Sequence, residues 1–272
     1  MNCFPLGTEV ASSFASDGFI VVRQLLDAEE TGLLRTIARR DSALTATRSA
    51  RADGEGGAVD LVVENSLSDN DYLSAIVRGE SLVDFMQKLL GDEVYHYHHK
   101  LILKEPLIGG AWTWHQDYGY WYSNGCLFPD MASCMIAVDK ATRENGCLQV
   151  LRGSQRMGRV DHVRCGDQTG ADPERVQAAC ARMELVHVEL DPGDAVIFHG
   201  NLLHRSDQNR SQDPRWAFIC CYNTRSNSPI REGRHPLYTP LQRLSDDAVR
   251  TVGKQHLQRL LDAESRTPGI LK

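Results

Sequence analysis

Long hydrophobic runs are missing from this sequence of 272 residues. No apolar segment approaches the ~20 residues that a helix needs to cross a bilayer. Residues 1–14 also lack the basic start and the apolar stretch of a signal peptide. We therefore expect no membrane partner, no secretion and a cytoplasmic location.

Positive charge is scarce as well. The chain has 30 Lys and Arg against 36 Asp and Glu, and its formal net charge is −6. A protein held to nucleic acid by phosphate contacts normally carries a basic excess, so this balance argues against such a partner. We expect a small-molecule substrate, and no pattern in the sequence specifies an oligomeric state.

None of the eight cysteines forms a C-x-x-C pair, which argues against a zinc ribbon and against a thioredoxin-type redox site. A chain of this length can bury a full core without disulfides. We therefore interpret the cysteines as reduced thiols, several of them packed as small apolar residues on strands.

The N-terminal third, about residues 1–93, is predicted to be mostly helical. Asp27 precedes one helix, whose first turn is acidic, and a second helix fits Ser81–Leu90, where Gly91 ends it. Residues 43–60 are rich in Gly, Ser, Thr and mixed charge, which is typical of a mobile surface loop.

From about residue 94 apolar and polar residues alternate, as they do in strands. The predicted strands are Val94–Lys104, Ser133–Val138, Gly146–Leu151, Leu185–Leu190, Asp194–Phe198 and Trp216–Tyr222. Short strands after a helical start favour a mainly β fold with flanking helices, a sandwich or barrel. We expect one domain over 1–272, with a helical buttress at about 1–93, a β core at about 94–225 and a helical C-terminal tail.

A long insertion, about 155–183, interrupts the predicted strands and contains a short helix over 173–182. Long insertions are often functional, and this one could form a lid over a site. It could equally cover an exposed edge strand.

Trp114-His115-Gln116-Asp117 places an imidazole and a carboxylate two residues apart. Alternate residues of an extended segment point the same way, so both side chains could bind one cation. The pair alone is weak evidence. A second match, His187-Val-Glu189, lies in an apolar strand, where we interpret it as ordinary alternation.

Residues beyond Asp194 strengthen the first match, because His204 and Ser206 are followed by Arg215. Two histidines and one carboxylate on one face of an iron ion leave three coordination positions open. Two of these can take a bidentate keto acid and the third dioxygen. The planar fork of an arginine such as Arg215 suits the second carboxylate of such a keto acid.

In its ordered motifs the chain resembles the phytanoyl-CoA dioxygenase family of Fe(II)/2-oxoglutarate oxygenases. The resemblance runs over nearly the whole chain, and it implies a double-stranded β-helix, that is, a cupin-like jelly roll. The matching segments are Phe14–Arg23, Leu103–Pro106, His115-Gln-Asp, Ile136–Asp139, Glu144–Leu148, Arg152-Gly-Ser, Gly193–Gly200, His204-Arg-Ser and Arg215.

The resemblance implies roles for particular residues. His115, Asp117 and His204 would be the iron ligands, while Arg215 and Ser206 would bind the distal carboxylate of 2-oxoglutarate. Two further cosubstrate contacts fall on Lys100 and Met135, where the family often has methionine and tryptophan. Family members that halogenate have a small residue at the position of Asp117, so the carboxylate here implies hydroxylation.

The implied reaction uses Fe(II), 2-oxoglutarate and O2, hydroxylates an aliphatic carbon, and releases succinate and CO2. Three aromatic residues beside Asp117, namely Tyr118, Tyr120 and Trp121, could form a wall that holds an ammonium group by cation–π contact. Simple packing explains them equally well. Arg225 could attract an anionic substrate or belong to a solvated surface.

These features favour a small polar substrate, such as an amino acid or an aminoalkylphosphonate. An acyl-CoA is the substrate class in the family's name, but no extended basic patch for its phosphates is evident. Two other classes stay open, a metal-dependent cupin-like enzyme that does not use 2-oxoglutarate and a non-catalytic jelly-roll binding module.

Overall fold

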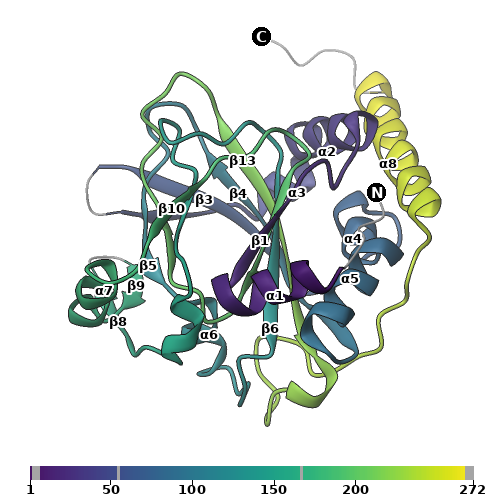
Figure 1. Cartoon of the computed structure of the whole chain (residues 1–272). Coiled ribbons are helices and arrows are strands. Elements are labelled where there is room, and N and C mark those ends of the chain that lie inside the picture. The colour runs from purple at the N-terminus through teal and green to yellow at the C-terminus, as the bar shows by residue number, and fades with distance from the viewer. Residues whose placement is uncertain (2–6, 54–55, 166–167, 267–272) are drawn as a thin grey trace.

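A computed structural model describes residues 1, 7–53, 56–165 and 168–266. Two antiparallel sheets form the centre of the molecule (Figure 1). The larger sheet has the order β1 (Phe19–Val22), β11 (Ala195–His199), β6 (Met131–Ala137), β13 (Arg215–Thr224), β4 (Val94–Lys104), β3 (Ala58–Glu64) and β2 (Ser49–Ala52). The smaller has the order β10 (Leu185–Val188), β7 (Leu148–Leu151), β12 (His204–Ser206) and β5 (Trp112–His115).

These sheets confirm the predicted mainly β fold of the double-stranded β-helix type. Every strand predicted from the alternating pattern is present, with shifts of a few residues at the ends. β13 is buried along its whole length because it lies in the middle of the larger sheet, between β6 and β4. This continuous burial explains the unbroken apolar run after Arg215.

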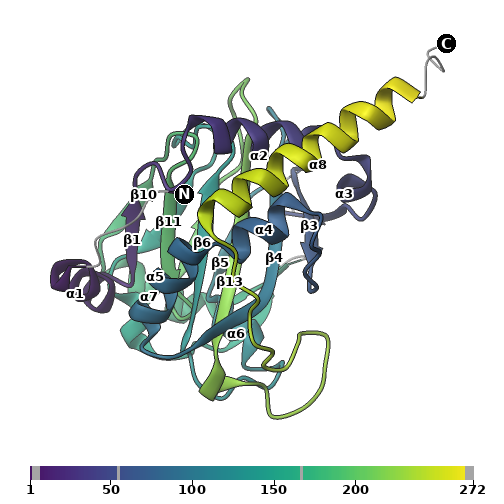
Figure 2. The same cartoon turned by 90° about the vertical axis from the view of Figure 1, so that its right-hand side faces the viewer.

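Helices lie on both sides of the sheets (Figures 1 and 2). The helical layer on the outer face of the larger sheet includes α2, α4, α5 and α8, and Figure 2 shows α8 lying across α2 and α4. None of the helices in the described ranges is long and apolar enough to cross a membrane. The helices are α1 (Thr8–Asp17), α2 (Ala28–Arg40), α3 (Ser42–Ala46), α4 (Tyr72–Val77), α5 (Glu80–Leu90), α6 (Asp117–Trp121), α7 (Pro173–Cys180) and α8 (Asp246–Arg266).

The start of α2 shows how local sequence specifies this layer. Asp27 accepts a hydrogen bond from the backbone N–H of Glu30, and the Glu30 carboxylate accepts one from the N–H of Asp27. This capping box satisfies two of the free N–H groups at the helix start. Behind it, Leu34 and Ile37 are fully buried against the sheet.

The loop predicted over residues 43–60 is wrong for the described part of that range. The chain forms the end of α3, all of β2 and the beginning of β3 there, while residues 54–55 lie outside the described residues. β3 pairs with β4, with Leu61 opposite Ile102, and so extends the larger sheet. The prediction followed the polar composition of this segment, although the alternation of Val59, Leu61 and Val63 is a strand pattern. With β1, these strands make the N-terminal third less helical than predicted.

The insertion at 155–183 is fastened to the smaller sheet. It contains the hairpin of β8 (His162–Cys165) and β9 (Gln168–Ala171), followed by α7. The Gln168 side chain accepts a hydrogen bond from the N–H of Thr113 at 2.9 Å and donates to the carbonyl of Ala111 at 2.9 Å. These bonds attach the hairpin beside β5. Lid movement stays a prediction.

Two neutral histidines are buried on β4. A hydrogen bond of 3.0 Å joins Nε2 of His96 to Nδ1 of His99. Burial and the neighbouring imidazoles lower the pKa of His96 to about 3, and burial lowers the pKa of His99 to about 4. In the unfolded chain both groups take up protons near pH ~6.5. The stability that they contribute is therefore complete above that pH and is lost as the pH falls towards ~4.

We expect acid to weaken the fold through this pair. Between about pH 7.5 and pH 5 the free energy of unfolding should fall by about 2 kcal/mol for each histidine, as urea denaturation at the two pH values will show. A His99→Gln variant should lose less stability over the same interval. An equal loss in the variant would assign the pH dependence to other groups.

Candidate active site

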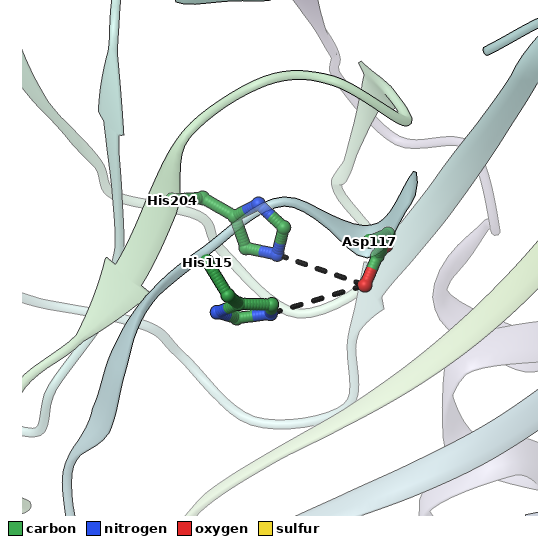
Figure 3. Close-up of side chains that lie close together, drawn as sticks. All are labelled: His115, Asp117 and His204. Carbon is green, nitrogen blue, oxygen red and sulfur yellow. Dashed lines mark ion pairs between the residues drawn. The ribbon is translucent and has the colours of Figure 1, made fainter. Parts of the chain in front are cut away.

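Cross-strand pairing brings the candidate metal ligands together. His204 on β12 lies directly opposite His115 on β5, with ring centroids 4.0 Å apart. Asp117 follows at the start of α6, so its carboxylate reaches both rings (Figure 3). Its Oδ1 lies 3.8 Å from Nε2 of His115 and 4.0 Å from Nε2 of His204. The three side chains are buried and their donor atoms could hold one metal ion.

Backbone carbonyls orient the two imidazoles. Nδ1 of His115 lies 2.8 Å from the carbonyl of Thr113, and Nδ1 of His204 lies 2.9 Å from that of Leu202. Since a carbonyl can only accept, each Nδ1 carries the proton and each Nε2 keeps its lone pair towards the site. Burial lowers the pKa of both imidazoles, which keeps them neutral. Two neutral imidazoles and a carboxylate are a donor set that suits Fe(II).

The carboxylate of Asp117 is held in its charged form. Burial alone would raise its pKa, but the Lys100 ammonium and a hydrogen bond from Ser133 lower it overall. Oγ of Ser133 donates to Oδ2 of Asp117 at 2.8 Å, leaving Oδ1 towards the histidines. Ser133 therefore acts as a positioning residue for the carboxylate.

We expect Ser133→Ala to weaken Fe(II) binding by about tenfold, because partners of metal ligands typically contribute that much. An anaerobic Fe(II) titration measures this. Ser226→Ala is the matched control, since Ser226 donates a similar hydrogen bond of 2.6 Å to Asp92 on the surface. Unchanged iron affinity in Ser133→Ala would remove the positioning role.

Gln116 fixes the backbone between the two ligands of the His115-Gln-Asp motif. Its side chain is fully buried and donates to the carbonyls of Asn201 at 2.7 Å and Gly158 at 2.8 Å. It also accepts from the N–H of Val160 at 2.7 Å. The motif is thereby tied to the loop before His204 and to the insertion.

A cavity of about 250 Å³ lies between the two sheets and contains the His–Asp–His cluster. Most residues predicted for the site line it. They are His115, Asp117, His204, Arg215, Ser206, Met135, Lys100, Tyr120 and Trp121. The larger sheet supplies one wall, and β5, β7 and β12 supply the other.

Arg215 faces the His–Asp–His cluster from the opposite sheet. It begins β13, which pairs with β4 and β6 and not with β12, so the chain crosses the cavity between His204 and Arg215. The side chain is only 3% exposed, and within the described ranges its Nε has no hydrogen-bond partner. Burial lowers the pKa of Arg215 to about 10, which leaves it charged at neutral pH. A buried, unpaired guanidinium calls for an anion, and a carboxylate of 2-oxoglutarate fits it.

Two of the predicted substrate residues lie elsewhere. The hydroxyl of Tyr118 points away from the cavity and donates to the carbonyls of Cys126 and Leu127. Arg225 is exposed and pairs with Glu93 at 3.3 Å. Neither residue lines the cavity.

Several residues that line the cavity were not predicted from the sequence, among them Arg51, Arg234 and His235. The alternation of β3 could have revealed the hairpin that carries Arg51. Arg234 and His235 lie in a segment without helix or strand, where no periodic pattern signals their position.

Two facing antiparallel sheets around a buried His–Asp–His cluster define a jelly-roll metalloenzyme of the facial-triad type. The profile of the phytanoyl-CoA dioxygenase family matches residues 14–217, three quarters of the chain. The chain belongs to that family. It is a dioxygenase that depends on Fe(II), 2-oxoglutarate and O2.

Several curated proteins and solved structures are similar to this chain. L-proline trans-4-hydroxylase from Streptomyces griseoviridis is 33% identical over 183 residues, which cover 61% of this chain and 68% of the relative. Ectoine dioxygenase from Sphingopyxis alaskensis is 26% identical over 241 residues, which cover 83% of this chain and 78% of the relative. The crystal structure of EctD from S. alaskensis with 2-oxoglutarate and 5-hydroxyectoine superposes with a TM-score of 0.74 at 24% identity, over 90% of this chain and 89% of that one. The last comparison shows a shared fold.

Proposed function

We propose that this enzyme hydroxylates an aliphatic carbon of a small zwitterion, such as an amino acid or an aminoalkylphosphonate. When bound at Fe(II), 2-oxoglutarate and O2 would supply the oxidising chemistry: one oxygen atom would enter the substrate as a hydroxyl group, and 2-oxoglutarate would leave as succinate, which takes the other oxygen atom, and CO2. The observation that carries the proposal is the cavity of about 250 Å³, which is lined both by the His–Asp–His cluster and by Arg215, whose Nε has no hydrogen-bond partner within the described ranges.

The residues have separate tasks in this proposal. His115, Asp117 and His204 hold the iron, and Arg215 with Ser206 binds the distal carboxylate of 2-oxoglutarate. Met135 flanks the cosubstrate from the larger sheet, and Lys100, which lies on β4 between His98 and the partner of Arg215, borders both the cosubstrate and the substrate. These roles are supported by the neutral imidazoles, the charged carboxylate and the common cavity that all these residues line.

The size and the aromatic wall of the cavity support a small substrate with an ammonium group. Tyr120 and Trp121 line the cavity next to Asp117, where they can hold a cation over a ring face. At about 250 Å³ the cavity is at the small end for ligand pockets. L-proline, ectoine and 2-aminoethylphosphonate, which name three relatives, are compounds of this size.

The alternatives are less well supported. A fatty acyl-CoA is much larger than this cavity, although one relative is named a probable phytanoyl-CoA dioxygenase. A cupin-like enzyme without 2-oxoglutarate would leave Arg215 buried without an anion.

We also propose that residues 1–272 act as one catalytic domain in the cytoplasm. Both sheets line one cavity, and the helical layer packs on the outer face of the larger sheet. The cysteines for which the structure describes the side chain are free thiols, as is usual in a reducing compartment.

Turnover with a panel of compounds tests the substrate class. The panel contains L-proline, other small amino acids, ectoine, 2-aminoethylphosphonate and a fatty acyl-CoA. We expect at least one zwitterion to stimulate succinate formation and to be hydroxylated in equal amount, with no stimulation in His204→Ala. Stimulation by the acyl-CoA alone would refute the proposed substrate class.

A further inference from the structure

The cavity has positive charge at two ends. Arg215 lies at one end, Arg234 lines the other together with His98 and His235, and Lys100 lies between them on β4. On the β4–β13 ladder, Arg215 pairs with Lys104 whereas His98 pairs with Cys221. Arg215 and Cys221 are six positions apart on β13, which corresponds to about 20 Å along the strand. The two ends can therefore bind different molecules.

The metal and the cosubstrate leave the second end without a counterion. The charges of Fe(II) and Arg215 are balanced by Asp117 and by the two carboxylates of 2-oxoglutarate. Lys100 and Arg234 then add positive charge to a partly enclosed site. Within the described ranges neither forms an ion pair with a carboxylate of the protein. Since unbalanced charge in such a site is unfavourable, an anionic ligand would stabilise it.

Unsatisfied nitrogens lie at the same end. His98 is 5% exposed and lines the cavity, and its Nδ1 has no hydrogen-bond partner within the described ranges. Nδ1 of His235 is also buried and has no hydrogen-bond partner within the described ranges. Buried imidazole nitrogens are normally hydrogen-bonded, so two of them beside an open cavity indicate a ligand that completes the bonds.

The segment that carries Arg234 is held in position. The His235 ring stacks on Tyr97 with centroids 4.6 Å apart and an interplanar angle of 21°. Three residues later, the Tyr238 hydroxyl donates to Glu93 at 2.6 Å. These contacts fix the backbone directly after Arg234, whose side chain lines the cavity.

We propose that Arg234, with Lys100 and His98, binds an acidic group of the substrate, a carboxylate or a phosphonate. The substrate then lies between this end and the metal, while 2-oxoglutarate lies between the metal and Arg215. This inference rests on the proposed function and assigns a specificity-determining residue, Arg234, that lies beyond residues 14–217, which the family profile matches.

Acetate and methylphosphonate are the smallest probes that carry the two acidic groups. Each is titrated calorimetrically into anaerobic enzyme loaded with Fe(II) and excess 2-oxoglutarate, so that Arg215 is already occupied. We expect at least one probe to bind, and Arg234→Gln to weaken its affinity by about tenfold, as expected for the loss of a charge-assisted contact. The tighter of the two probes identifies the acidic group. Acetamide, which is neutral, should bind no better to the wild type than to the variant.

Arg231→Gln is the matched control, because Arg231 is exposed on the same segment and does not line the cavity. It should retain the affinity of the wild type. Arg234 is itself exposed, so the glutamine should not disturb folding. The inference is overturned if neither probe binds to the wild type, or if Arg234→Gln binds the probe with the affinity of the wild type. The proposed function is unaffected by either result as long as the wild type binds iron and 2-oxoglutarate. If the wild type does not bind iron or 2-oxoglutarate, the proposed function itself is overturned.

Discussion

In the His204→Ala variant, the weak visible charge-transfer band of an enzyme–Fe(II)–2-oxoglutarate complex is expected to be absent. His204 supplies one of only two imidazoles in the cluster, and its Nε2 faces Asp117 across 4.0 Å. Loss of a metal ligand should lower iron affinity by more than ~100-fold, since even the outer partners of ligands contribute 10–100-fold. Anaerobic titration with Fe(II) and then 2-oxoglutarate measures both steps.

The second His-x-Glu match provides the control. His187 lies on β10 and does not line the cavity, so His187→Ala should form the band as the wild type does. Iron binding of normal affinity in His204→Ala would show that the cluster is not the metal site.

Arg215→Ala should separate iron binding from cosubstrate binding. A buried charge-assisted pair typically loses 2–5 kcal/mol when one partner is removed, so the Kd for 2-oxoglutarate should rise by roughly 30-fold to 1000-fold or more. Iron affinity should change little, because Arg215 starts a strand of the opposite sheet and donates no ligand. Arg215→Lys should recover part of the affinity, since lysine keeps the charge but not the planar fork.

Arg210→Ala is a suitable control for this experiment. Arg210 is exposed, precedes Arg215 by five residues and does not line the cavity. It should leave the Kd for 2-oxoglutarate unchanged. If Arg215→Ala bound 2-oxoglutarate as tightly as Arg210→Ala, the distal carboxylate would need another partner.

Much of the fold was predictable because strand alternation and turn residues are local signals. The strands after residue 94 and the helix after Asp27 follow from such patterns. β3 was missed for the opposite reason. Its polar surroundings resemble a loop, and it becomes a strand only by pairing with β4, which lies some 40 residues further along the chain.

The candidate site also contains residues that local sequence patterns reveal and residues whose positions depend on the folded topology. The His115-Gln-Asp motif and His204 could be recognised from their residue types, whereas the position of Arg215 in the opposite sheet required the topology of both sheets. Arg234 reaches the cavity only because His235 stacks on Tyr97, a contact between segments far apart in the sequence. No local pattern specifies such a contact.

The direct pairing of His115 with His204 has a consequence for how this chain can diversify. The backbone pairing of β5 with β12 sets the separation of the two imidazoles, whereas the segment around Arg234 belongs to neither strand. Substitutions and insertions at the rim, including the segment around Arg234, can therefore change which molecule is accepted without disturbing the oxygen-activating centre. Oxidation chemistry and substrate choice are thus separable traits, and new substrates can be selected by mutating the rim while the ligand-bearing strands are kept.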